Sequence, residues 1–318
     1  MIDSIDKTIN KPIHYGLDIG GTKMEIALFS HDFELLDSWR LPTPINDYQD
    51  FIQTIEKMVD EADLKSNHKG TLGIGLPGVI SKFGCTKSSN VPCLTGKDIT
   101  KDLKNLLNRD LAVSNDSRLF ALSEANSKNT HQYKRLYGAI LGTGAAGGFC
   151  IDGAMYQGKN NLAGEYGHIG ISGVLLQRYN LPIRACGCGL EGCYETYVAG
   201  PGLNWLWQLF NKDSNKISTT FDFVAQLRAK NPIALKTFEC YMDILGASFS
   251  TIVLSYDPDL IVIGGGLSNI NEIIDALPSA INKHLFEGAE APLIRRADFG
   301  DSSGVRGAAL IGNQHANL

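Results

Sequence analysis

The segment YGLDIGGTKMEIALF, residues 15 to 29, indicates the fold more clearly than any other stretch of the chain. It consists of an apolar run, a glycine-rich reversal and a second apolar run, which is typical of two strands joined by a tight hairpin. Residues 137 to 151, YGAILGTGAAGGFCI, repeat this pattern. A glycine-rich tip leaves backbone N–H groups accessible to phosphate oxygens, although either loop alone could be an ordinary turn. Because the pattern occurs twice, we predict two lobes, each with a phosphate-binding hairpin.

Other apolar runs indicate the α/β class. Short runs that end in glycine or polar residues occupy 71–78, 110–116 and 259–266, and they are typical of strands buried on both faces. Residues 47–65 have apolar side chains at helical spacing, and residues 234–256 form a stretch too long for a strand. Strands and helices therefore alternate along the chain.

Length, composition and charge limit the classes of protein to which this chain can belong. The chain has 318 residues, 43% of them hydrophobic, which is long for one domain. Its net charge of -5 comes without a block of lysine or arginine, so nucleic acids and anionic membrane surfaces are not expected partners. No stretch is long and apolar enough for a signal peptide or a membrane span, which predicts a cytoplasmic protein. In such a reducing compartment the cysteine cluster at 186–193 indicates a metal site or catalysis before disulfides.

The common nucleotide-binding motifs do not explain the glycine loops. Gly142, Gly144 and Gly147 match G-x-G-x-x-G, but a strand-like segment and an Asp-Gly turn follow, where a dinucleotide site needs a helix. The sequence also has no P-loop and no H-R-D or D-F-G segment of a protein kinase. The remaining interpretation is a two-lobed phosphate clamp.

The segment CGCGLEGCYE, residues 186 to 195, predicts a structural zinc site. Three thiolates and one upstream imidazole make a closed tetrahedral Cys3His set, formed by Cys186, Cys188, Cys193 and His168. An iron–sulfur cluster would require a fourth thiolate at another spacing, and free structural thiols fit poorly with a glycine-rich loop. A closed site leaves zinc no position for water, so its role is to hold Glu165, His168 and Glu195 in one wall.

Several motifs together resemble those of the ROK sugar kinases, which belong to the actin-like ATPase superfamily. They are DIGGTK at 18–23, LGTG at 141–144, GEYGH at 164–168, the cysteine cluster and IGGG at 263–266. The resemblance covers essentially the whole chain after the first dozen residues. Within the family, GIGLPG, NVPCLTGK, FALSEA and SYDPDLIVIGGGLSN look most like bacterial N-acetyl-D-glucosamine kinases.

The resemblance implies a two-lobed actin-like ATPase fold, related to ribonuclease H, with a structural zinc loop. It implies transfer of the γ-phosphate of ATP to the 6-hydroxyl of N-acetylglucosamine, with Mg²⁺ required, Zn²⁺ structural and a homodimer expected. N-acetylmannosamine and glucose are alternative substrates. A non-catalytic sugar sensor is the alternative from another class, since the family includes repressors that carry an added helix-turn-helix domain. The expected small lobe is 1–117 completed by a C-terminal helix near 304–318, and the large lobe is 118–303.

The resemblance also assigns the site residues. The expected nucleotide-binding residues are Asp18, Gly20, Gly21, Thr22, Lys23, Gly142, Thr143, Gly144, Gly265 and Gly266. The expected sugar-binding residues are Gly78, Asn115, Asp116, Glu165, His168 and Glu195. Asp116 follows a strand predicted to end at Ser114, and it matches the family's catalytic base, although an aspartate there could also be an N-cap.

Two positions depart from the family pattern. Ser117 and Arg118 stand where relatives usually have Ala-Asn, and Ala146 stands where glycine is common. We expect Arg118 to affect the support of the base and the Ala146 Cβ to crowd the nucleotide. Neither change removes a group assigned to the chemistry, so the expected effect is on rate.

Overall fold

The computed structural model describes residues 12–80, 84–88, 90–211 and 219–317. The chain forms two compact units. The first comprises residues 1–127, 155–163 and 301–318, and the second comprises 128–154 and 164–300. Among the helices in the described ranges, none combines the length and the apolar character needed to cross a membrane.

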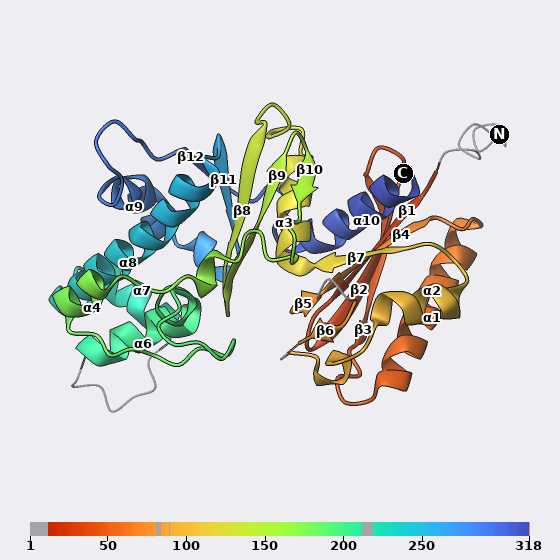
Figure 1. Cartoon of the computed structure of the whole chain (residues 1–318), viewed down its shortest axis with the longest axis horizontal. Coiled ribbons are helices and arrows are strands. Elements are labelled where there is room, and N and C mark those ends of the chain that lie inside the picture. Colours follow the sequence, from red (N-terminus) through yellow and green to blue (C-terminus); the bar gives the residue numbers. More distant parts are fainter. Residues whose placement is uncertain (1–11, 81–83, 89, 212–218, 318) are drawn as a thin grey trace. The chain divides into compact units, whose positions relative to one another are not determined.

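The first unit is built on a mixed sheet with the strand order β3-β2-β1-β4-β7 (Figure 1). The strands are β1 (His14–Ile19), β2 (Lys23–Phe29), β3 (Leu35–Pro42), β4 (Thr71–Leu76) and β7 (Ala112–Asn115). β1 and β2 are antiparallel and form the first predicted hairpin, whereas β4 lies parallel to β1 and β7 parallel to β4. A two-stranded ladder of β5 (Val79–Ile80) and β6 (Thr86–Lys87) and the short helix η1 (Pro92–Leu94) follow β4 in the sequence.

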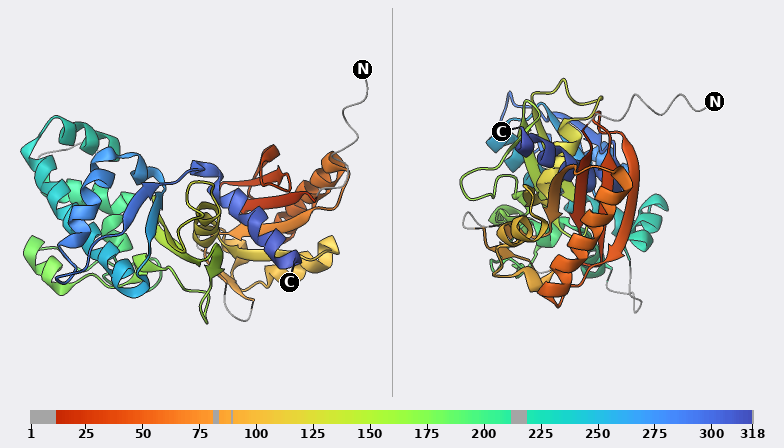
Figure 2. Two further views of the ribbon diagram at one scale, coloured as in Figure 1. Left: turned by 90° about the horizontal axis from the view of Figure 1, so that it is seen from above. Right: turned by 90° about the vertical axis from the view of Figure 1, so that its right-hand side faces the viewer.

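Side-chain alternation in β1 explains how both faces of this sheet are covered. Tyr15 and Leu17 belong to the apolar core that includes α1 (Tyr48–Ser66) and α2 (Ile99–Leu107). Gly16 points the other way, and a Cβ built on it would lie 1.8 Å from the backbone oxygen of Val305 in α10 (Ser303–Ala316). Figure 2 shows α10, in blue, against the red strands of this unit. The missing side chain lets helix and sheet backbones come into contact.

The helix α3 (Asp116–Ala125) packs against α10, and it therefore stays with the first unit. A Cβ on Gly307 would lie 1.9 Å from the Leu119 backbone oxygen. The Arg306 guanidinium donates to the backbone oxygens of Ser123 at 2.8 Å and Asn126 at 3.0 Å, near the end of α3. The sequence placed the boundary between 117 and 118, whereas this packing carries the first unit to residue 127.

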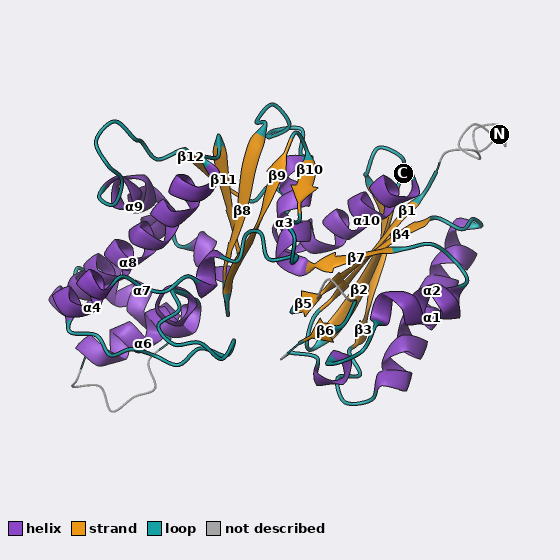
Figure 3. Ribbon diagram, in the orientation of Figure 1, coloured by secondary structure: helices purple, strands orange, loops and turns teal. Residues whose placement is uncertain are grey.

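The sheet of the second unit has the order β10-β9-β8-β11-β12 (Figure 3). Its strands are β8 (Arg135–Leu141), β9 (Ala145–Ile151), β10 (Ala154–Tyr156), β11 (Leu260–Gly264) and β12 (Leu293–Arg296). β8 and β9 form the second predicted hairpin, β11 is parallel to β8, and β12 is parallel to β11. The pairing repeats that of β2, β1, β4 and β7, which confirms the predicted α/β class and the internal repeat.

Helices pack on this second sheet around one large apolar core. They include α6 (Gly200–Phe210), α7 (Thr220–Arg228), α8 (Pro232–Tyr256) and α9 (Asn271–Asn282). Shorter elements carry site residues: η2 (Tyr166–His168), α4 (Gly173–Tyr179), α5 (Glu195–Val198) and η3 (Gly266–Asn269). The short helix η4 (Gly300–Ser302) leads into α10. The Asn231 side chain caps α8, and Asp257 ends it in the left-handed conformation, so the predicted long helix is confirmed.

Candidate functional site

The tip of the first hairpin is a closed turn held by a neighbouring segment. The Gly20 N–H donates to the Lys23 backbone oxygen at 2.9 Å, which places Gly21 and Thr22 at the tip. The Thr43 hydroxyl donates to the Gly20 oxygen at 2.7 Å, and the Thr43 N–H donates to the Thr22 oxygen at 3.1 Å. The predicted phosphate loop of the first unit is therefore rigidly supported.

Asp18 precedes this tip, near the end of β1, and two glycines make room for its carboxylate. A Cβ on Gly75 would lie 3.0 Å from Asp18 Oδ1, and a Cβ on Gly304 would lie 2.5 Å from Oδ2. Burial, and then the negative charge of Asp116, raises the pKa of Asp18 to about 7. A carboxylate enclosed in this way gains from a nearby cation, which would favour its ionised form.

Gly78, Asn115 and Asp116, three of the predicted sugar-binding residues, lie close together in the first unit. The Asn115 Nδ2 donates to the Gly78 oxygen at 2.8 Å, and its Oδ1 accepts from the Ser117 N–H at 3.0 Å. Asn115 is therefore the N-cap of α3, and β7 ends at Asn115 rather than at Ser114. Gly78 has φ +99°, and a Cβ there would lie 2.2 Å from the Lys87 oxygen, so only glycine suits this position. Since Asn115 makes the cap, Asp116 is left for another role.

The carboxylate of Asp116 is held by its neighbours in α3. Burial raises its pKa, while the Ser117 N–H, which donates to Asp116 Oδ1 at 2.7 Å, and the Arg118 charge oppose that rise. Arg118 is buried, and it donates to the backbone oxygens of Asn161 and Ala163. The unusual arginine thus lowers the cost of keeping the Asp116 carboxylate ionised.

In the second unit, two glycines set the position of the GEYGH segment on β9. A Cβ on Gly164 would lie 2.4 Å from the Gly147 oxygen, and a Cβ on Gly167 would lie 1.9 Å from the Ala145 oxygen. Between them Tyr166 is buried, and its hydroxyl donates to the Ile140 oxygen at 3.1 Å. The adjacent Glu165 and His168 side chains are only partly buried. The backbone contacts therefore fix where these two polar groups emerge.

Glu195 contacts the second glycine loop directly. Its Oε2 accepts from the Ala145 N–H at 3.0 Å, and a Cβ on Gly144 would lie 2.9 Å from the same oxygen. Its Oε1 lies 3.7 Å from the Cys186 Sγ. Glu195 therefore links the glycine loop to the cysteine cluster. Ala146 pairs with Ile140 in the strand ladder and is not among the described residues that line the nearby cavity.

The four predicted zinc ligands lie together. Cys186 Sγ lies 3.7 Å from His168 Nδ1, Cys188 Sγ lies 3.7 Å from Cys193 Sγ, and all four ligand atoms lie within 4.8 Å of one another. Tetrahedral zinc bonds of about 2.0–2.3 Å place ligand atoms roughly 3.5–3.8 Å apart. Burial raises the pKa of Cys193 to about 12, so adjacent thiolates need a cation to offset their charge. The donor set and its spacing therefore fit zinc, with the imidazole Nδ1 facing the thiols.

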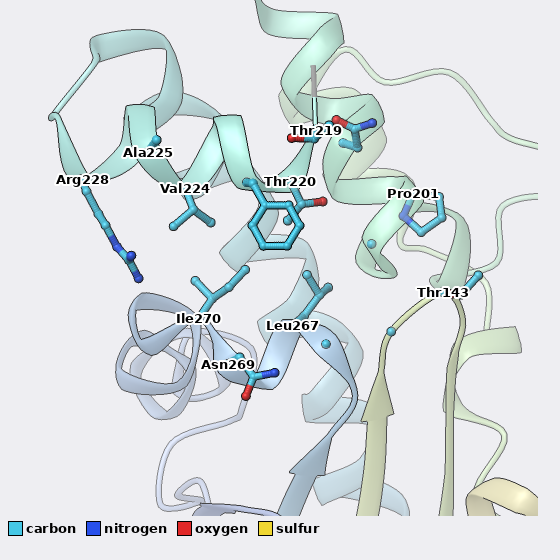
Figure 4. A pocket seen from close by; sticks show the side chains of 15 residues that line it. Thr143, Pro201, Thr219, Thr220, Val224, Ala225, Arg228, Leu267, Asn269 and Ile270 are labelled. Atoms are coloured by element: carbon cyan, nitrogen blue, oxygen red, sulfur yellow. The ribbon is translucent and has the colours of Figure 1, made fainter. Parts of the chain in front are cut away.

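A cavity of about 960 Å³ opens beside the second glycine loop (Figure 4). Three predicted nucleotide-binding residues, Gly142, Thr143 and Gly266, line it. Gly265 is adjacent, with φ +81°, and a Cβ on it would lie 2.4 Å from the Leu141 oxygen. The structure thus brings the glycines of β8–β9 and of β11–η3 to one cavity.

Most of the cavity wall was not predicted from the sequence. The missed lining residues are Gly200, Pro201, Asn204, Thr219, Thr220, Phe221, Val224, Ala225, Arg228, Leu267, Asn269 and Ile270. They come from α6, α7 and η3, and from the residues next to these helices. The Gly-Pro pair at 200–201 is a helix-start signal, and it could have indicated a helix N-terminus beside the loop. The α7 residues carry no local signal, since a helix that lines a cavity has the same periodicity as one that covers a core.

The chain is similar to known proteins in both sequence and structure. The sequence pattern of the ROK family matches residues 14–315. The chain is 51% identical over 301 residues to the N-acetylgalactosamine kinase AgaK of Shewanella sp. (strain ANA-3), covering 95% of this chain and 97% of that protein. It is 38% identical over 303 residues to the N-acetyl-D-glucosamine kinase of Haemophilus influenzae (strain 86-028NP), covering 94% and 99%. The crystal structure of the ROK hexokinase from Thermus thermophilus matches with a TM-score of 0.84 and 27% identity, covering 96% and 99%.

Proposed function

The chain belongs to the ROK family, and on that premise we propose that it transfers the γ-phosphate of ATP to the 6-hydroxyl of an N-acetylhexosamine. We also infer the actin-like ATPase fold, which the repeated sheet topology and the similarity to the ROK hexokinase support. A homodimer remains part of the proposal, and light scattering of the purified protein tests it.

One observation carries the proposal. The loop at 142–144 adjoins the 960 Å³ cavity through Gly142 and Thr143, and it adjoins the Glu195 carboxylate through Gly144. The cavity volume suits a nucleotide-sized ligand. A glycine loop with a cavity on one side and a carboxylate on the other suits a phosphate chain that leads toward a polyol.

The proposed roles follow from the chemistry of each group. Asp116 accepts the proton of the attacking hydroxyl, since a partly enclosed carboxylate is an apt general base. Glu165, His168 and Glu195 hydrogen-bond sugar hydroxyls. Mg²⁺, when bound with ATP, would neutralise phosphate charge, and the Asp18 carboxylate is suited to interact with it. Phosphoryl transfer depends mainly on alignment, which the glycine contacts around these groups support.

The Cys3His cluster is proposed to hold a structural zinc ion. Binding through Nδ1 would leave the proton of His168 on Nε2, which could then donate to a sugar oxygen. The ion would join the GEYGH segment to the loop that carries Glu195. It would thereby fix the spacing of Glu165, His168 and Glu195.

Two N-acetylhexosamines are candidate substrates. The resemblance of motifs predicts N-acetylglucosamine, which the Haemophilus relative's name also states. The relative with the higher identity, 51%, is named for N-acetylgalactosamine. These sugars differ only in the configuration at carbon 4, so a small change in the pocket can reverse the preference. We propose N-acetylgalactosamine as the better substrate and N-acetylglucosamine as the second.

A coupled ADP-release assay tests the proposal. N-acetylgalactosamine, N-acetylglucosamine, N-acetylmannosamine and glucose are compared by kcat/KM. We expect both leading sugars to exceed glucose by at least ~100-fold, because glucose leaves the partners of the acetamido group unpaired. Sugar binding without ADP release would instead indicate the sensor alternative. A higher kcat/KM for glucose would contradict the substrate class, and a higher value for N-acetylmannosamine would contradict the choice of the two leading sugars. Neither result would contradict the kinase activity.

A further inference from the structure

The cavity in the second unit has two chemically different ends. One end is backbone-rich: the Gly200 N–H donates to the Gly142 oxygen at 2.7 Å, so the start of α6 adjoins the glycine loop. The other end is apolar, and in Figure 4 Val224 of α7 and Ile270 after η3 point toward one another. A ligand that joins an anionic part to an apolar part would suit both ends.

Phe221 is the unusual residue at the apolar end. Its side chain is 87% exposed, although it lines the cavity and has no core role. A capping box fixes its backbone: the Asp222 N–H donates to the Thr219 hydroxyl at 3.2 Å, and the Thr219 N–H donates to the Asp222 carboxylate at 2.8 Å. An aromatic ring held in this way and left exposed is suited to stack on a planar ligand.

At the apolar end of the cavity, the positive charge of Arg228 is balanced by a neighbouring carboxylate. The Arg228 guanidinium, in the last turn of α7, contacts the Glu272 carboxylate through Nε at 2.7 Å and Nη2 at 3.3 Å. The pair leaves little net positive charge to attract a second anionic group. The part of a ligand that occupies the apolar end therefore needs no negative charge of its own.

Asn204 supplies a polar contact along the wall. Its Oδ1 is buried and accepts no hydrogen bond from the described part of the chain, and the residue lines the cavity from α6. A buried carbonyl oxygen without a donor is costly unless a ligand supplies one. An N–H or O–H on the ligand would satisfy it.

We infer that Phe221 stacks on the nucleobase of the phosphate donor and that Asn204 Oδ1 accepts a hydrogen bond from its nucleoside. The inference rests on the proposed function, since it takes the donor to be ATP. The triphosphate then extends toward Gly142 and Thr143. Phe221 acts on affinity for the base and takes no part in the transfer itself.

Calorimetry on the full-length protein tests the inference with two probes, ATP and inorganic tripolyphosphate, which lacks the base. Phe221→Ala should weaken ATP binding about tenfold, or about 1.4 kcal/mol, and leave tripolyphosphate binding within about twofold. Phe221→Tyr should restore ATP binding, and Asn204→Ala should weaken ATP alone. Phe286→Ala is the matched control, because Phe286 is also exposed, at 70%, and is not among the described residues that line the cavity.

The outcomes separate this inference from the proposed function. Unchanged ATP affinity in Phe221→Ala, an equal loss for both probes, or no ATP binding by the native protein overturns the inference. If no sugar is phosphorylated while ATP affinity depends on Phe221, the inference holds and the proposed function fails. In steady state, Phe221→Ala should raise the KM for ATP about tenfold and change kcat and the KM for sugar less than twofold.

Discussion

Asp18→Asn should make the protein more stable and less active. The Asp18 carboxylate is enclosed between Gly75 and Gly304 and lies in the field of Asp116, which together raise its pKa to about 7. Below the ordinary pKa of 3.8 both folded and unfolded chains are protonated, so the residue has no net effect. As pH rises, the unfolded chain ionises first, and the free energy of unfolding falls until the folded chain also ionises near pH 7.

The size of the effect follows from that difference. About three pH units separate the two values, and at about 1.4 kcal/mol per unit the native chain loses at most ~4 kcal/mol above pH 7. At pH 5 only about one unit of that range has been crossed, so the loss is ~1.5 kcal/mol. Asparagine is nearly isosteric and has no charge, so it removes the loss. It also removes the group suited to interact with Mg²⁺, and kcat/KM should fall at least ~10-fold.

Urea unfolding followed by circular dichroism, at pH 5 and pH 8 without added Mg²⁺, measures this difference. The control is Asp60→Asn, which changes an exposed carboxylate on α1 of the same unit. We expect the gain from Asp18→Asn to be larger at pH 8 than at pH 5 and the control to show no gain at either pH. Equal stability of Asp18→Asn and the native protein at pH 8, or a gain independent of pH, would refute the reasoning.

Three further predictions concern the proposed chemistry. Asp116→Asn should lower kcat on the order of 10²-fold while sugar still binds in calorimetry; near-native turnover would remove Asp116 from the mechanism. Cys188→Ser should lose bound zinc and weaken sugar binding together, and elemental analysis showing no zinc in fully active native protein would contradict the site. Gly144→Ala should raise the KM for sugar and for ATP several-fold, because its Cβ would lie 2.9 Å from Glu195 Oε2; Gly187→Ala, where a Cβ meets nothing within 4 Å, is the control, and equal KM values in both variants would argue against a role for this contact.

The local sequence pattern was sufficient to predict much of the fold and part of the candidate site. Residues 15–29 and 137–151 predict two hairpins because alternation of apolar and glycine residues over a few positions is a property of the chain itself, and both hairpins form. The cysteine spacing likewise brought Cys186, Cys188 and Cys193 close together, since they are separated by only a few residues. His168 lies 18 residues from Cys186 in the sequence, so its approach to the thiols depends on the fold of the segment between them.

The tertiary structure determined which segments, distant in the sequence, contact one another. Asn115 became the cap of α3 and the partner of Gly78 because β4 and β7 are neighbouring parallel strands. The cavity wall on α6 and α7 had no sequence signal, because helical periodicity marks a buried face without identifying its neighbour. The sequence also does not distinguish the structural roles of individual glycines. Gly20 makes a turn, whereas Gly307 lets α10 contact α3. Which role a glycine plays depends on the backbone that folding brings against it.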